Sequence, residues 1–242
     1  MSDKRLLDRQ ANLVEYLTSG AAIFGDDGGA PADRGLHAFD LGRLRLEAKF
    51  SHEKRMRKIE AVFPRTLRFL ARGPGDPLEA FTRACAPRSI RRYDNARQFY
   101  RFLEEIWRRE APTPLYLADV AAYELAVAKV RSTHADRKPE YEGARPALRR
   151  HPSVELLILH HDIRALFEDN EEPIEPGRGD FFVAMTLTAE DLDPRVIQVS
   201  QQVFELLRAL DGWIPVEATG LGSVARDIIA HLVGAGFLEA AE

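Results

Sequence analysis

The amino-acid sequence predicts an α+β fold, with a helical domain at residues 1–150 followed by a small α/β domain at residues 151–242. Three observations support this prediction. Apolar residues recur at helical spacing through most of the first part. Short apolar runs with the density of strands occur only after residue 150. The segment Ser132–Arg150 is polar and contains two prolines and one glycine, so we expect the domain boundary in this linker.

The first domain is expected to consist of helices. The longest is expected to bend near Phe63 and Pro64, because proline interrupts a helix, and Asp94 is expected to cap the fourth. Leu115–Arg131 is rich in alanine, which lets neighbouring helices approach closely, so we place it at the centre of this domain. Gly20–Gly35 is glycine-rich and is expected to be a loop. The expected helices are Lys4–Thr18, Leu41–Ala71, Leu78–Cys85, Asp94–Arg109 and Leu115–Arg131.

The second domain alternates short strands and helices. Its order of elements is typical of a winged helix, in which strands, a helix, a turn, a second helix and a returning strand follow one another. The acidic, proline-containing segment Glu171–Gly179 is expected to be a loop. The expected strands are Val154–His161, Phe181–Thr188, Arg195–Val199 and the pair Phe237-Leu238; the expected helices are Val199–Leu210 and Ser223–Val233.

Charge is distributed unevenly along the chain. The whole sequence has a net charge of −4. Residues 40–110 contain 18 Lys and Arg against 10 Asp and Glu, a net +8, whereas residues 151–242 contain 5 against 17, a net −12. The two parts are therefore expected to prefer partners of opposite sign. For the basic middle of Leu41–Ala71, two interpretations stay open, a solvated helix face and a surface that binds phosphate or acidic protein.

Composition also constrains the compartment. The single cysteine, Cys85, excludes an internal disulfide and a cysteine-based zinc site, and its alanine neighbours favour a packed residue over a nucleophile. No apolar run approaches the length of about 18 residues needed to span a bilayer, and the first residues do not resemble a secretory signal. We expect a cytoplasmic protein without membrane contact.

The polar residues do not predict a catalytic or metal site. Asp119 and Glu124 are five residues apart on one predicted helix, so they point about 140° apart. His160 and His161 are neighbours on a predicted strand and therefore point to opposite faces. The sequence contains no nucleophile or metalloprotease motif. We expect no metal, no cofactor and no catalysis by this chain alone.

A winged helix has two common uses, and the charge favours one of them. The predicted second helix carries Arg226 beside Asp227 in an acidic domain, which would repel the phosphates of DNA. A strand edge beside that helix could instead accept a basic peptide as an additional strand. The alternative is a DNA-binding transcriptional regulator that uses the basic surfaces at Lys49–Lys58 and Arg88–Arg101.

Four segments resemble a known protein family. They are HEKRMRKIEAVFPRTLRFL, RRYDNARQFYRFLEEIW, PLYLADVAAYELAVAKVR and HPSVELLILHHDIRALFEDN, followed by the winged-helix pattern. In this order they resemble the partner subunits of TIM-barrel multinuclear-iron enzymes, which modify cysteine in ribosomally made peptides. The family includes the C protein of methanobactin biosynthesis and its counterpart in thiaglutamate biosynthesis. The resemblance covers most of residues 3–238.

The resemblance implies a non-catalytic accessory subunit in a heterodimer. Such a subunit binds the leader of the precursor peptide and docks onto the enzyme, which holds the iron. Two cysteine modifications stay open, oxazolone-thioamide formation and excision of a cysteine carbon. The family places leader binding in the C-terminal domain, which resembles the recognition elements of peptide-modifying systems. This suggests the edge of Phe181–Thr188 and the groove beside Ser223–Val233, with peptide contacts at Phe182, Val183, Met185, Leu187, Arg226 and Ile229. The expected enzyme contacts are Arg91, Arg92, Tyr93, Tyr116, Asp119 and Tyr123.

Overall fold

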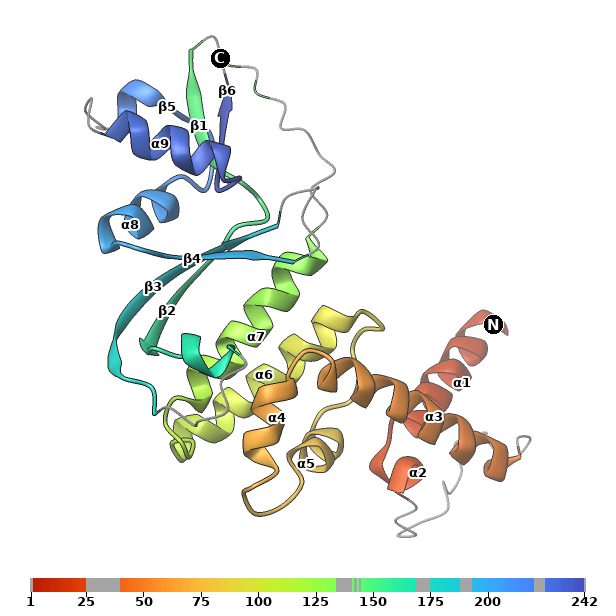
Figure 1. The fold of residues 1–242 in the computed structure, drawn as a ribbon. Helices are drawn as coiled ribbons and strands as arrows, with labels where there is room; N and C mark the ends of the chain where they lie inside the picture. The colour runs from red at the N-terminus through yellow and green to blue at the C-terminus, as the bar shows by residue number, and fades with distance from the viewer. Residues whose placement is uncertain are drawn as a thin grey trace. The chain divides into compact units, whose positions relative to one another are not determined.

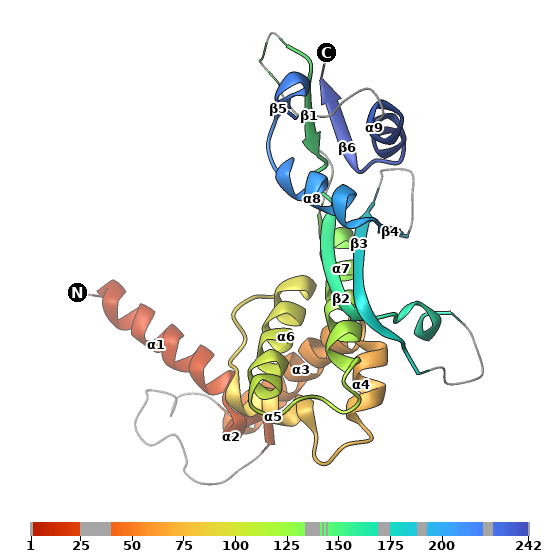
Figure 2. The same cartoon turned by 90° about the vertical axis from the view of Figure 1, so that its left-hand side faces the viewer.

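The computed structural model consists of two compact units, Met1–Glu110 and Ala111–Glu242. Figure 1 and Figure 2 show the elements of both units. The mixed α+β class is confirmed, with helices throughout the chain and two three-stranded antiparallel sheets in the second unit. The residues that the structure describes are 2–24, 40–133, 141, 143, 145–168, 175–187, 193–219 and 225–241.

The first unit is helical, as expected. Its helices confirm the predicted ones with shifts of a few residues at their ends. One correction concerns Gly20–Gly35: its first five residues form a short helix instead of a loop, and residues 25–39 lie outside the described part. The helices are α1 (Ser2–Leu17), α2 (Gly20–Phe24), α3 (Leu41–Glu60), α4 (Pro64–Leu70), α5 (Pro77–Ala84) and α6 (Arg92–Arg109).

Local sequence explains where these helices begin. The carboxylate of Asp40 accepts hydrogen bonds from the backbone N–H groups of Gly42 and Arg43 and so caps α3. The predicted bend is confirmed, because α3 ends at Glu60 and α4 begins at Pro64. Proline suits the first position of α4, where a backbone N–H would have no partner.

Helix α6 begins two residues earlier than predicted, and Asp94 is not its cap. The N-cap residue is Arg91, which makes no side-chain capping bond. Asp94 lies in the first turn, where a negative charge favours the helix dipole. Its carboxylate accepts a hydrogen bond of 2.6 Å from the hydroxyl of Ser89. The aspartate therefore stabilises the start of α6 without capping it.

Aromatic rings form the core of the helical unit. Phe63, Phe81 and Phe99 are fully buried. The ring centroid of Phe99 lies 5.5 Å from that of Phe63 and 5.2 Å from that of Phe81, both in edge-to-face geometry. These contacts join α5 and α6 to the residue that precedes α4.

The alanine-rich helix α7 (Leu117–Ser132) belongs to the second unit, which corrects two predictions. The compact units divide after Glu110 instead of within 132–150, and α7 is not the centre of the helical domain. The reason is packing, because Val120 and Val130 of α7 are buried in one cluster with Val183 and other strand residues. The apolar residues of α7 lie around the helix without forming one stripe, so the sequence does not indicate which partner it covers.

Two antiparallel sheets follow α7. In the first sheet the strand order is β2-β3-β4, and in the second it is β5-β1-β6. The predicted strands are confirmed, whereas β1 and β5 are additional; β1 lies at the end of the segment that we expected to be a linker. The elements are β1 (Ala147–Arg150), β2 (Glu155–His161), the 3-10 turn η1 (Arg164–Leu166), β3 (Arg178–Thr186), β4 (Arg195–Val199), α8 (Gln201–Ala209), β5 (Ile214–Pro215), η2 (Val216–Thr219), α9 (Ala225–Gly234) and β6 (Leu238–Ala241).

Both faces of the β2-β3-β4 sheet are covered. Val183 and Met185 of β3 belong to the cluster under α7, whereas Ala184 belongs to the cluster formed with α8 and α9. This follows from the alternation of side chains along a strand. Figure 1 shows α7 on one side of the sheet and α8 on the other. Among the described helices, none is both long and apolar enough to cross a membrane.

Candidate peptide-binding site

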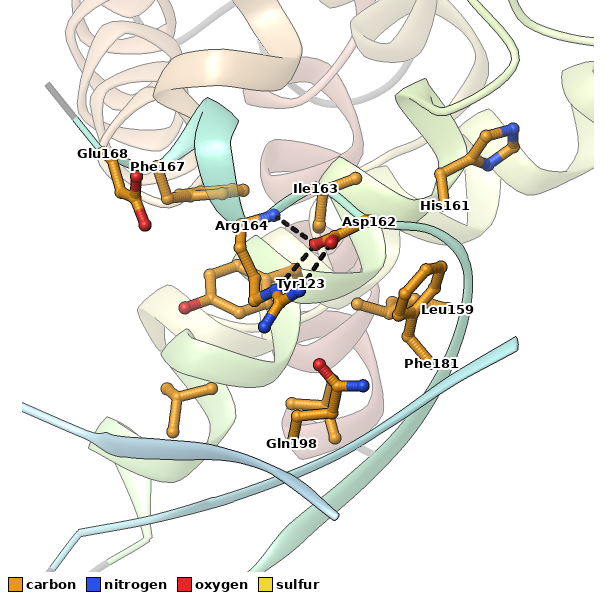
Figure 3. A pocket seen from close by; sticks show the side chains of 12 residues that line it. Tyr123, Leu159, His161, Asp162, Ile163, Arg164, Phe167, Glu168, Phe181 and Gln198 are labelled. Atoms are coloured by element: carbon orange, nitrogen blue, oxygen red, sulfur yellow. Dashed lines mark hydrogen bonds and ion pairs between the residues drawn. The ribbon is translucent and has the colours of Figure 1, made fainter. Parts of the chain in front are cut away.

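A cavity of about 350 Å³ lies on the α7 side of the β2-β3-β4 sheet. Tyr123 of α7, Leu159 of β2, Phe167 after η1 and both Val196 and Gln198 of β4 contribute to its lining. Figure 3 shows the side chains of these elements around one space. The cavity therefore lies where α7 covers β2 and β3 and the edge strand β4 continues the sheet.

Two aromatic side chains form much of one wall. The ring centroids of Tyr123 and Phe167 are 4.4 Å apart. Burial raises the pKa of the Tyr123 phenol, so the hydroxyl is neutral at physiological pH and can donate a hydrogen bond. The two rings make this wall apolar, whereas the Tyr123 hydroxyl adds a polar group to it.

One ion pair lies beside the cavity. Arg164 donates from Nε to Asp162 Oδ1 at 2.8 Å and from Nη2 to Asp162 Oδ2 at 2.6 Å. The hydrogen bond from Arg164 lowers the pKa of the Asp162 carboxyl, which is therefore ionised at neutral pH. Because the Arg164 side chain is mostly exposed, we expect this pair to contribute little to stability. It offers a polar and charged rim to a ligand.

The edge strand β4 presents alternate side chains to the cavity. Val196 and Gln198 line it, whereas Ile197 and Val199 pack against the cluster on the other face of the sheet. Within the described part of the chain, β4 pairs with β3 on one side and has no strand on its other side. The cavity thus extends along the outer strand of the described part of this sheet.

A buried aspartate holds α7 against β2 near the cavity. Asp119 Oδ2 accepts a hydrogen bond of 2.7 Å from His161 Nδ1 and one of 3.1 Å from the backbone N–H of His160. The register of β2 and β3 shifts between Leu159 and His161, as in a β-bulge. Asp119 and His161 are 7% and 8% exposed. Asp119 is thus held in an internal contact, and His161 also belongs to the lining of the cavity.

A second constellation resembles a hydrolase triad but is structural. His151 Nδ1 lies 2.6 Å from the Ser153 hydroxyl, and His151 Nε2 lies 3.6 Å from a carboxylate oxygen of Glu239. The serine is only 1% exposed, and its oxygen lies 3.0 Å from the Thr186 hydroxyl, which donates to the carbonyl of Gly236. A buried serine cannot reach a substrate, so this network joins β3 to the turns before β2 and β6.

The two adjacent histidines diverge, as predicted from strand geometry. His160 is exposed, and its Nδ1 lies 3.1 Å from Asp180, whereas His161 turns inward to Asp119. In the described part of the chain, no group of three or more His, Cys, Asp or Glu side chains could hold a metal ion. Cys85 is partly buried, and burial raises the pKa of its thiol, which agrees with a packed residue instead of a nucleophile.

The predicted peptide contacts do not form one groove. Strand β3 is the central strand and is paired on both sides, so it has no free edge, which corrects that prediction. Val183 and Met185 are buried beneath α7, where Val183 also lines the cavity, and Leu187 packs against the same cluster. Phe182 lies on the opposite face, with its ring centroid 5.2 Å from that of Phe204. Ile229 is half-buried against the other core cluster, and the side chain of Arg226 lies outside the described part.

The predicted enzyme contacts are divided between the two units. Arg91, Arg92 and Tyr93 lie at the start of α6, and the two arginines are exposed. The other three belong to α7 or the residue before it. Asp119 is buried in its contact with His161 and so offers no surface to a partner. Tyr123 lines the cavity, and Tyr116 lies against His161, with ring centroids 6.2 Å apart.

Among the described residues that line the cavity, Tyr123 and Val183 were predicted contacts, whereas the others, including Phe167, Val196 and Gln198, were not predicted. The β-branched residues of Arg195–Val199 predict the strand but not its position at the sheet edge. A comparison of the sequence with protein-family models and with curated proteins found no match to either. Functional inference for this chain therefore depends on its residues, their geometry and the resemblance of its motifs.

Proposed function

We propose that this chain is a non-catalytic accessory subunit that binds the leader of a ribosomally made precursor peptide and docks onto a multinuclear-iron enzyme. In this proposal the second unit is a winged-helix-like recognition element, and the enzyme holds the iron and modifies a cysteine. The observation that carries the proposal is the cavity beside β4, because it combines a strand edge with a lined pocket. The resemblance of the sequence motifs supplies the biological context.

Strand addition at β4 is the binding mode that this geometry supports best. A peptide that pairs with the outer edge of β4 satisfies its own backbone groups, while alternate side chains point to the same face of the sheet. On the α7 side, those side chains would lie beside Val196 and Gln198 and enter the cavity next to Phe167. An apolar or aromatic side chain of the leader would fill the apolar part of the cavity. The Asp162–Arg164 pair would contact a neighbouring polar residue of the leader.

The charge of this region favours a basic peptide over nucleic acid. Residues 151–242 have 5 arginines and no lysine against 17 acidic residues. Helix α9 would be the recognition helix of a DNA-binding winged helix, and it carries the exposed Asp227 in its first turn. Affinity for DNA comes largely from neutralising phosphates, which an acidic surface opposes. We therefore favour the peptide over the DNA-binding alternative.

The leader proposal is tested by placing a charge at the cavity side of β4. In Val196→Asp we expect binding of a fluorescently labelled synthetic leader to weaken at least about tenfold, because a carboxylate would face the apolar cavity. The matched control is Ile158→Asp, since Ile158 is similarly exposed but lies on β2, the opposite edge strand. Fluorescence anisotropy measures both affinities. Equal affinities for the two variants would exclude β4 as the peptide site.

Docking onto the enzyme is tested separately at the start of α6. Arg91 and Arg92 are exposed, and neither makes an ion pair with any described residue. For the double variant Arg91→Glu with Arg92→Glu we expect loss of co-purification with the iron enzyme from the same gene neighbourhood. The control is Arg108→Glu with Arg109→Glu, which reverses the same charge at the other end of α6. If both variants retain the enzyme equally, this surface does not form the interface.

A further inference from the structure

A second cavity, in the helical unit, has a cationic lining. It has a volume of about 240 Å³, and its lining includes His52, Lys54, Arg55 and Lys58 of α3. Lys54 and Lys58 are four residues apart, so successive turns of α3 direct them to the same side of the helix. Hydroxyl groups, the amide of Asn95 and apolar side chains complete the lining, and none of the described residues that line it is acidic. A cavity of this kind attracts an anion.

Arg55 supplies a buried positive charge to this cavity. It is 7% exposed, and its guanidinium donates to Asn95 Oδ1 at 3.1 Å, to the Cys85 carbonyl at 2.8 Å and to Gln98 Oε1 at 2.9 Å. All three acceptors are neutral. Burial lowers the pKa of Arg55 to about 10, so the group is still charged at neutral pH. The structure thus holds the guanidinium rigidly and, among the described residues, provides no carboxylate to neutralise it.

Lys58 is also fixed in position while keeping hydrogen-bonding capacity. Its ammonium donates to the carbonyl of Ile90 at 2.6 Å. An ammonium has three N–H groups, and among the described residues only one of them has a partner, the carbonyl of Ile90. Lys54 is exposed and makes no ion pair or hydrogen bond with another described residue. Three cations therefore converge on one small space.

His52 adds a buried polar group without a described partner to the lining of this cavity. Its Nδ1 is buried and has no hydrogen-bond partner within the described part of the chain. Burial, followed by the charge of Arg55, lowers the pKa of His52, so the ring is neutral at physiological pH. Glu53 and Asp76 act in the opposite direction but do not line the cavity. A buried unpaired ring nitrogen is costly, and a ligand oxygen would remove this cost.

We propose that this cavity binds the phosphate group of a small molecule, with the ligand's apolar part against Leu17, Ile23 and Ile90. The three cations would make charge-assisted hydrogen bonds to the oxyanion. The volume lies below the usual range of about 300–1,000 Å³ for larger organic ligands, which limits the size of the molecule. A small, partly apolar space suits one phosphate better than the phosphate series of a nucleic-acid backbone. This proposal is independent of the peptide site, because the cavity belongs wholly to the helical unit.

The probe that tests the proposal is inorganic phosphate added to the full chain at constant ionic strength. Because a ligand that binds only the folded state stabilises it, we expect phosphate to raise the melting temperature more than chloride does. In Lys54→Gln with Lys58→Gln we expect the phosphate affinity, measured by calorimetry, to fall at least about tenfold. The control variant is Arg43→Gln with Lys49→Gln, which removes the same charge from exposed positions of α3 outside the cavity. We expect it to bind phosphate as the unaltered chain does.

Three results would overturn the proposal. Equal stabilisation by chloride and phosphate would show that the rise in melting temperature comes from general charge screening. Equal losses in the two variants would show that net charge, and not this cavity, attracts the anion. A duplex oligonucleotide could also compete with phosphate for the chain. If both variants weakened binding of the oligonucleotide equally, these cations would belong to an open nucleic-acid surface.

Discussion

The two units accommodate buried charge in opposite ways. In the helical unit, Arg55 is buried among neutral oxygen acceptors, and its positive charge is not neutralised by a described carboxylate. In the second unit, the Asp119 carboxylate is buried against an imidazole and a backbone N–H, so it is used in an internal contact. The first unit thus keeps a cationic field available to a ligand, whereas the second uses its buried acid to position α7. The candidate sites differ accordingly, one for an anion and one for a peptide.

The largest effect that tests this comparison is expected for Arg55→Met. The substitution leaves the oxygens of Asn95, Gln98 and Cys85 without their donor, so we expect the free energy of unfolding to fall by about 2–4 kcal/mol. Urea denaturation followed by circular dichroism measures this change. The control is Arg57→Met, because Arg57 is exposed on the same helix and should cost no more than about 0.5 kcal/mol. An unchanged or increased stability of Arg55→Met would mean that the cost of burying the charge exceeds the benefit of its three hydrogen bonds.

A smaller loss of stability is expected for Asp119→Ala in the second unit. The change leaves the His160 N–H and the His161 ring nitrogen unpaired, which should lower the free energy of unfolding by about 1–3 kcal/mol. Asp180→Ala, which removes only the exposed contact to His160, should cost about 0.5 kcal/mol or less. A double-mutant cycle with His161→Phe isolates the interaction, and we expect a coupling energy of at least about 0.5 kcal/mol. Additive effects of the two substitutions would show that the contact does not hold α7 in place.

The sequence predicted local structure well and the partners of each element poorly. The bend at Pro64 and strand β4 depend on residues next to each other in the chain, and both are confirmed. The predicted centre of the helical domain was wrong because α7 is apolar around most of its circumference. The pattern of apolar residues in such a helix does not identify the surface that the helix covers.

The candidate site was harder to predict because strand order is not encoded locally. An apolar run such as Phe181–Thr188 predicts a strand, but only the pairing with β2 and β4 reveals that it is central. Strand β1 was missed because it is short and contains two arginines. Its cross-strand pairing of Arg149 with Glu239 joins residues 90 positions apart. The Asp119–His161 contact likewise spans 42 positions, a separation at which spacing rules give no signal.

The register shift at the end of β2 has a consequence for the orientation of α7. Since α7 has no single apolar stripe, packing alone would permit several rotations about its long axis. The Asp119 carboxylate removes this freedom by accepting two hydrogen bonds from consecutive residues at the shifted end of β2. Tyr123 lies one turn later on the same side of the helix. The irregular strand end thus sets the angular position of the helix and, through it, the direction in which the phenol enters the cavity.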